Sequence, residues 1–81
     1  MVKIKDRIPD KEIVKWLKKI RNQINQVKPQ TKKGEELLKN IEAYVNDCEY
    51  WMKEGDYVKA WEVLSFAWGL LEAGMELKEL L

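Results

Sequence analysis

The sequence predicts an all-α protein, an antiparallel up-down-up three-helix bundle. Apolar residues recur at spacings of three and four in three successive segments, which is the period of a helix that buries one side. Pro29 and Gly55 separate these segments, and no strand signal is found along them. The connections are short, so consecutive helices are expected to be antiparallel neighbours. A chain of 81 residues has the size of one domain.

The first helix is expected over residues 10–27, after a lead-in of residues 1–8. Asp10 is a good N-cap, and Pro9 is tolerated in a first turn, so either residue can open the helix. Lys28 ends it, because the residue before a proline disfavours the helical conformation. Its apolar stripe consists of Ile13, Trp16, Leu17, Ile20, Ile24 and Val27.

The second helix is expected over residues 32–54 and the third over residues 56–80. Thr31 starts the second helix, and Gly55 ends it because glycine adopts a left-handed conformation without steric cost. Asp56 then caps the third helix, which Gly74 can end early. The second stripe is Leu37, Ile41, Tyr44, Cys48 and Trp51. The third is Tyr57, Ala60, Trp61, Leu64, Ala67, Trp68, Leu71 and Met75.

These stripes predict a tryptophan-rich core. Because aromatic side chains bury much apolar area each, they are expected to contribute strongly to a core this small. A structural hydrogen bond is expected where Tyr44 and Asp47 approach the third helix. The predicted core contains Trp16, Trp51, Trp61 and Trp68, around Leu17, Ile20, Ile41, Tyr44, Leu64 and Leu71.

The composition argues against most catalytic chemistry. The chain has no histidine and one cysteine, Cys48, which excludes a disulfide, a zinc site within one chain and a histidine acid or base. We therefore expect no catalytic residue, metal or cofactor. A metal-dependent reaction at acidic residues such as Glu72 and Glu76 is the only enzymatic alternative. No segment is long and apolar enough to span a membrane, and a signal-peptide core is missing, so the expected location is the cytoplasm.

Charge is distributed unevenly along the chain. Residues 1–33 carry eleven Lys or Arg and three Asp or Glu, whereas residues 34–81 carry four and eleven. One interpretation is that a basic first helix packs beside acidic neighbours in the same fold. The alternative is a face that contacts the phosphates of a nucleic acid. The residues of that candidate face are Lys11, Lys15, Lys18 and Lys19.

The third helix carries more apolar residues than one core requires. A second set lies roughly 120° or more around the helix from the main stripe. Contact with two neighbouring helices widens a buried stripe and accounts for part of this set. An exposed apolar face would instead mark self-association or another protein partner. The candidate interface consists of Val63, Phe66, Leu70 and Leu77, and Phe66 is the residue hardest to place in a core.

The C-terminal half of the chain resembles two families. Gly55-Asp56-Tyr57 with Ala60, Leu64 and Ala67 resembles half of one tetratricopeptide repeat unit, although Cys48 and Glu72 depart from that motif and a solenoid needs about three units. A closer resemblance is to the small archaeal family called domain of unknown function family 357. It rests on Tyr44, Asp47, Tyr50-Trp51, Gly55-Asp56, Ala60, Ala67-Trp68-Gly69 and Glu72-Ala73-Gly74. This resemblance implies an archaeal helical bundle with no assigned activity.

Overall fold

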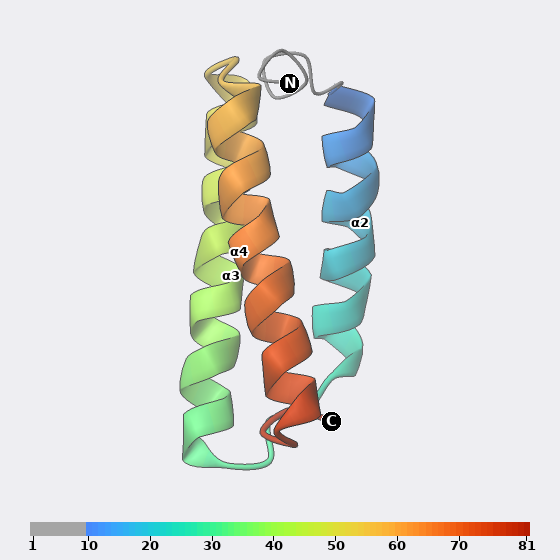
Figure 1. The fold of residues 1–81 in the computed structure, drawn as a ribbon, viewed down its shortest axis with the longest axis vertical. Helices are drawn as coiled ribbons and strands as arrows, with labels where there is room; N and C mark the ends of the chain where they lie inside the picture. The colour runs from blue at the N-terminus through green and yellow to red at the C-terminus, as the bar shows by residue number, and fades with distance from the viewer. Residues whose placement is uncertain (1–9) are drawn as a thin grey trace.

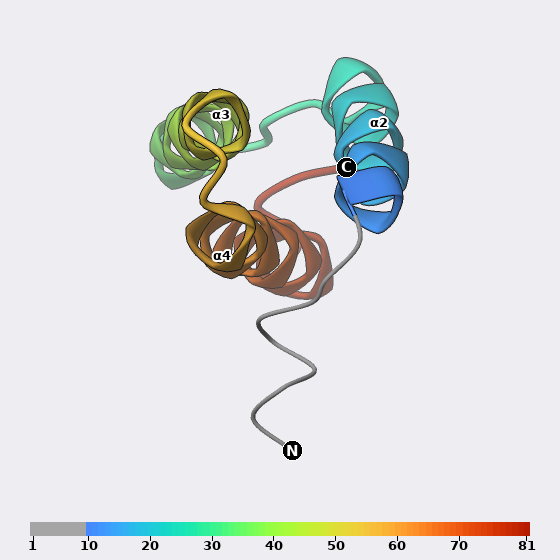
Figure 2. The same cartoon turned by 90° about the horizontal axis from the view of Figure 1, so that it is seen from above.

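The three helices of the bundle run in alternating directions. The computed structural model describes residues 10–81, which form α2 (Asp10–Gln26), α3 (Lys32–Lys53) and α4 (Tyr57–Glu76) (Figure 1). Seen along its length, the bundle is triangular, with one helix at each corner (Figure 2). The predicted antiparallel three-helix architecture is confirmed. The lead-in of residues 1–8 lies outside the described residues.

Capping groups define both ends of α3 and the start of α4. Thr31 is the N-cap of α3, where its hydroxyl accepts a hydrogen bond of 2.9 Å from the Gly34 N–H. At the other end Gly55 has φ +79°, and its N–H donates to the Met52 carbonyl in a left-handed cap. Asp56 then caps α4 by accepting from the Lys59 N–H at 3.0 Å. The expected bounds of α3 and the expected start of α4 are confirmed to within one residue.

The expectation that the third helix reaches residue 80 is wrong, because α4 ends at Glu76. Lys78 adopts φ 62°, and the N–H groups of Lys78 and Glu79 donate back to the carbonyls of Met75 and Gly74. This is the Schellman arrangement, with lysine in the left-handed position that glycine usually occupies. The helix also continues two residues beyond Gly74, so Gly74 is not its end.

The C-terminal tail, residues 77–81, turns back and closes one end of the bundle. It pairs with the α2–α3 connection through hydrogen bonds of 2.9 Å from Gln30 N to Glu79 O and from Leu81 N to Lys28 O. The Thr31 hydroxyl also donates to the Glu79 carboxylate. These contacts place Leu80 in the core, where none of its surface is exposed. The tail therefore belongs to the fold.

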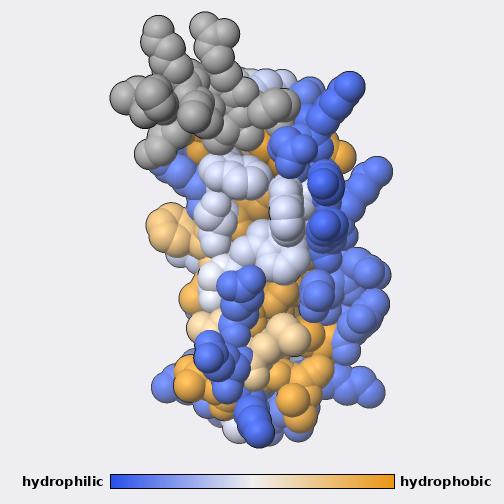
Figure 3. Space-filling view, turned by 45° about the vertical axis from the view of Figure 1, so that its right-hand side comes forward, coloured by the Kyte–Doolittle hydropathy of each residue, from blue (hydrophilic) through white to orange (hydrophobic). Residues whose placement is uncertain are grey.

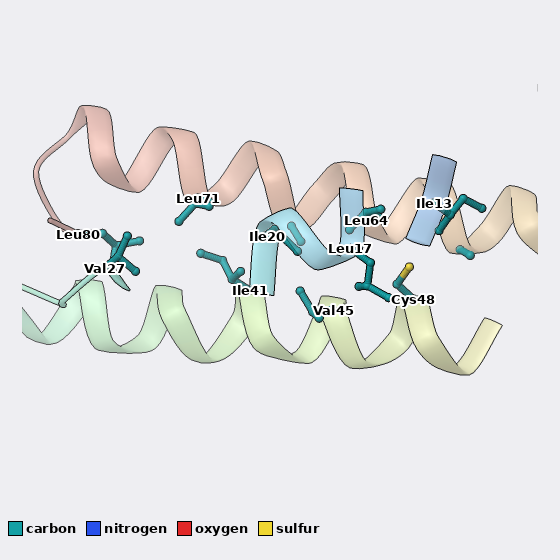
Figure 4. Close-up of a cluster of buried hydrophobic side chains, with 12 residues drawn as sticks. Ile13, Leu17, Ile20, Val27, Ile41, Val45, Cys48, Leu64, Leu71 and Leu80 are labelled. Atoms are coloured by element: carbon teal, nitrogen blue, oxygen red, sulfur yellow. The ribbon is translucent and has the colours of Figure 1, made fainter. Parts of the chain in front are cut away.

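The fully buried core is aliphatic (Figure 4). Its members come from all three helices, the α2–α3 connection and the tail. Small residues at the α3–α4 contact, including Ala60, Ala67 and Gly74, let these two helices approach more closely than either approaches α2. The buried residues are Ile13, Leu17, Ile20, Val27, Ile41, Val45, Cys48, Ala60, Leu64, Ala67, Leu71 and Leu80.

The prediction of a tryptophan-rich core is wrong. All four indoles are only half-buried and pack against the margin of the core. The close α3–α4 contact leaves no space for an indole, and an indole carries a polar N–H, so tryptophan is rarely buried completely. Three of them gather near α2 and α4, where Trp16 and Trp68 meet edge to face at 5.7 Å. Trp51 instead lies at the α3–α4 turn, beside Tyr50.

Candidate interaction surfaces

The predicted interface on α4 is largely accessible to solvent. We call Val63, Phe66, Leu70 and Leu77 the outer α4 face. Phe66 is 60% exposed and Leu77 is 71% exposed, whereas Val63 and Leu70 are half-buried and pack against the core. Packing within the bundle thus accounts for Val63 and Leu70, and it leaves Phe66 and Leu77 mostly exposed.

Phe66 extends the outer α4 face onto α3. Its ring lies 5.8 Å from that of Tyr44, with the two planes tilted by 37°. Tyr44 is half-buried and Asp47 is exposed, and within residues 10–81 no hydrogen bond joins them. The expectation of a structural hydrogen bond at this position is therefore wrong: Tyr44 makes an aromatic contact instead.

The spacing along the outer α4 face matches that of a helix-pairing seam. Val63, Phe66, Leu70, Ala73 and Leu77 follow one another at intervals of three and four residues. Ala73 is exposed like Phe66. An accessible large side chain and an accessible small one therefore lie on either side of Leu70. Strict three-and-four spacing is the pattern by which one helix packs against another in a coiled coil.

All four lysines of the candidate nucleic-acid face are exposed on α2. They do not form an isolated row of charges, because the Lys19 ammonium lies 4.4 Å from the centroid of the Trp16 ring and that of Lys15 lies 6.0 Å from it. Both contacts are within the range of a cation–π interaction. On another side of α2, Arg21 forms an ion pair with Glu49 of α3. Part of the positive charge of α2 thus has partners within the fold.

A groove that the sequence analysis did not predict lies where α2 and α4 meet. It has a volume of about 370 Å³, and we call it the indole groove. Figure 3 shows this side, with side chains of intermediate hydropathy gathered beside the hydrophilic surface of α2. The groove was missed because helical spacing assigned its indoles to the core. Its lining residues are Trp16, Trp61, Leu64, Ser65, Trp68, Gly69 and Glu72.

Two polar groups at the indole groove, those of Ser65 and Trp68, differ in their hydrogen bonding. The Ser65 hydroxyl donates a hydrogen bond of 2.8 Å to the Trp61 carbonyl one turn earlier. The Trp68 indole nitrogen is buried and has no hydrogen-bond partner among residues 10–81. A buried donor without a partner costs about 1–3 kcal/mol. The edge-to-face packing with Trp16 is the main contact of this indole with another aromatic ring.

Cys48 is a core residue with the protonation behaviour of a buried thiol. Burial, with a smaller contribution from the nearby Glu49 carboxylate, raises its pKa from 9.0 to about 11, and Arg21 partly opposes this shift. A thiol with so high a pKa holds very little reactive thiolate near neutral pH. Within residues 10–81 no three His, Cys, Asp or Glu side chains gather as metal ligands would.

Comparison with known proteins identifies the family. The family model described as "Protein of unknown function (DUF357)" matches residues 15–80. The chain belongs to the DUF357 family. The resemblance noted in the sequence is thereby confirmed. No curated protein matches the sequence.

A solved structure extends the family assignment to the fold. The chain is similar to protein AF1782 from the archaeon Archaeoglobus fulgidus, a DUF357 protein whose crystal structure is known. The two chains are 35% identical, each is covered over 88% of its length, and the TM-score is 0.79. The three-helix architecture is therefore shared with a DUF357 protein of an archaeon. No helix within residues 10–81 combines the length and the apolar character needed to cross a membrane.

Proposed function

We propose that this DUF357 protein is a non-enzymatic interaction module that self-associates through the outer α4 face. The observation that carries the proposal is the exposure of Phe66 on α4 and of Leu77 directly after it, while another side of α4 packs in the core. An apolar residue as large as phenylalanine, 60% exposed beside further apolar residues, favours an interface on a small domain.

A second copy is the occupant that the seam favours. In a two-fold antiparallel pairing of α4 helices centred between Gly69 and Leu70, the register sets Phe66 of one copy opposite Ala73 of the other. A large side chain then fills the space above a small one, as knobs-into-holes packing requires. The same patch serves both copies, which is the usual geometry of a homodimer.

The test is the substitution Phe66→Glu. We expect the variant to remain folded, because the side chain is mostly exposed, and to lose association, because a charge would be buried at the seam. The matched control is Tyr50→Glu, since Tyr50 is 53% exposed and packs edge to face against Trp51, near the α3–α4 turn and away from the contact between Phe66 and Tyr44. Light scattering after size exclusion gives the mass, and circular dichroism gives the helix content.

The outcomes of this test are distinct. Loss of dimer in Phe66→Glu alone supports the proposal. Equal loss in both variants, or a Phe66→Glu protein that unfolds, would contradict it. In the second case Phe66 would be a core residue.

The lysine-bearing side of α2 gives the second candidate, a nucleic-acid-associated protein. What supports it is the exposure of Lys11, Lys15 and Lys18. Because phosphate contacts release counterions, binding to mixed RNA or DNA should fall steeply with added salt and with Lys15→Glu. Absence of binding at low salt would remove this candidate.

A further inference from the structure

The groups that the indole groove offers to a ligand are electron-rich. Among residues 10–81, Glu72 is the one charged residue that lines the groove, and three indoles line it as well. The Ser65 hydroxyl has committed its proton to the Trp61 carbonyl, so it presents lone pairs to the groove. Aromatic faces carry negative potential as well. Apart from the indole N–H groups, of which that of Trp68 has no partner among residues 10–81, this combination favours a cation.

Gly69 is the one glycine within residues 10–81 at which neither packing nor backbone conformation requires glycine. A side chain at Gly34 or Gly74 would collide with neighbouring atoms, and Gly55 needs its positive φ. A Cβ atom at Gly69 would meet nothing within 4 Å. Glycine destabilises a helix interior relative to alanine, and it is the residue that lets a ligand approach the backbone closely. At the lining of the indole groove, Gly69 keeps that approach open.

The Trp16 ring already accepts an ammonium group. The Nζ atom of Lys19 lies 4.4 Å from its centroid, and the Lys19 side chain is exposed. Lys19 therefore covers the Trp16 ring, and this contact shows that an indole at the edge of the indole groove accepts an ammonium group. Lys19 also places a positive charge nearby, which weakens the attraction for any further cation.

We propose that the indole groove binds a small organic cation of the quaternary ammonium type. The indoles supply cation–π and apolar contacts, and Glu72 supplies the opposite charge. A volume of about 370 Å³ lies within the range of small-molecule sites. The site goes beyond the proposed self-association, because it faces α2 and requires no second copy.

Tryptophan fluorescence tests the site with two probes of the same shape. Choline carries the positive charge, and 3,3-dimethyl-1-butanol is its neutral carbon analogue. We expect choline to change the fluorescence saturably with a dissociation constant on the order of millimolar, and the alcohol to bind at least about fivefold more weakly. Equal effects of both probes would overturn the proposal, and so would no effect of either.

Variants locate the binding. We expect Glu72→Gln to weaken choline binding about threefold or more and Gly69→Leu to abolish it, while circular dichroism shows both folded. Glu76→Gln is the matched control, one turn later, exposed and outside the groove. Lys19→Gln should instead tighten binding about twofold, since it removes a competing charge. Equal weakening by Glu72→Gln and Glu76→Gln would show general surface attraction and overturn the assignment.

Discussion

Gly34 and Gly69 both lie inside helices, but their surroundings differ. At Gly34 a Cβ atom would stand 2.1 Å from the backbone oxygen of Glu79, so only glycine allows the tail to lie across the start of α3. At Gly69 the space is open. Glycine is therefore required by the packing at position 34, whereas at position 69 it only lowers the stability of the helix.

Alanine substitutions should separate these two uses. We expect Gly34→Ala to lower the free energy of unfolding by about 2 kcal/mol, because overpacking displaces the tail. Gly69→Ala should raise it by about 0.5–1 kcal/mol through lower backbone entropy of the unfolded chain. Thermal unfolding followed by circular dichroism measures both. Shifts of the same sign in the two variants would contradict the described packing.

The Cys48 thiol gives a pH dependence with a defined sign. Its pKa is raised from 9.0 to about 11, so the folded state holds the proton more tightly than the unfolded state. The stabilisation is complete below pH 9.0 and is lost as the pH rises towards about 11. We expect unmodified protein to lose more stability than Cys48→Ala between neutral pH and about pH 10, as measured by urea unfolding. Equal losses would mean that the thiol is not buried as described.

Residue environments were predictable only in part. Helical spacing located the aliphatic core positions Ile20, Ile41, Leu64 and Leu71, because they lie in the middle of their stripes. It failed for the indoles, since the size of a side chain decides whether it fits between closely packed helices, and spacing carries no information on size. The accessibility of Phe66 was predictable because that residue lies far from the main stripe.

At the scale of elements, the tail is the part that the sequence does not indicate. Pro29, Gly55 and Asp56 are recognisable boundaries, and the structure uses each of them. The end of α4 has no such marker, because Lys78 takes a left-handed conformation that sequence patterns assign to glycine or asparagine. The burial of Leu80 depends on contacts with a segment about fifty residues earlier, which local patterns do not describe.

Leu80 should contribute strongly to the stability of the whole bundle. We expect Leu80→Ala to cost about 2–5 kcal/mol, because a completely buried leucine leaves a cavity. Leu81→Ala is the matched control, since Leu81 is 64% exposed and should change stability by less than about 0.5 kcal/mol. Urea unfolding measures both variants. A small effect of Leu80→Ala would show that the tail is not part of the folded core in solution.

At the scale of the molecule, α4 connects the fold to its proposed uses. One side of α4 packs on α3 and the core, another meets α2 at the indole groove, and a third carries the outer α4 face. The number and order of helices followed from periodicity, because amphipathic stripes reflect burial directly. The indole groove required the structure, since it is formed jointly by α2 and α4.

The most direct test of self-association is sedimentation equilibrium of the unmodified protein over a wide concentration range at two salt levels. We predict a mass that rises from 9.7 kDa towards twice that value with concentration and does not depend on salt, because the seam is apolar. A mass of 9.7 kDa at every concentration would contradict self-association through the outer α4 face.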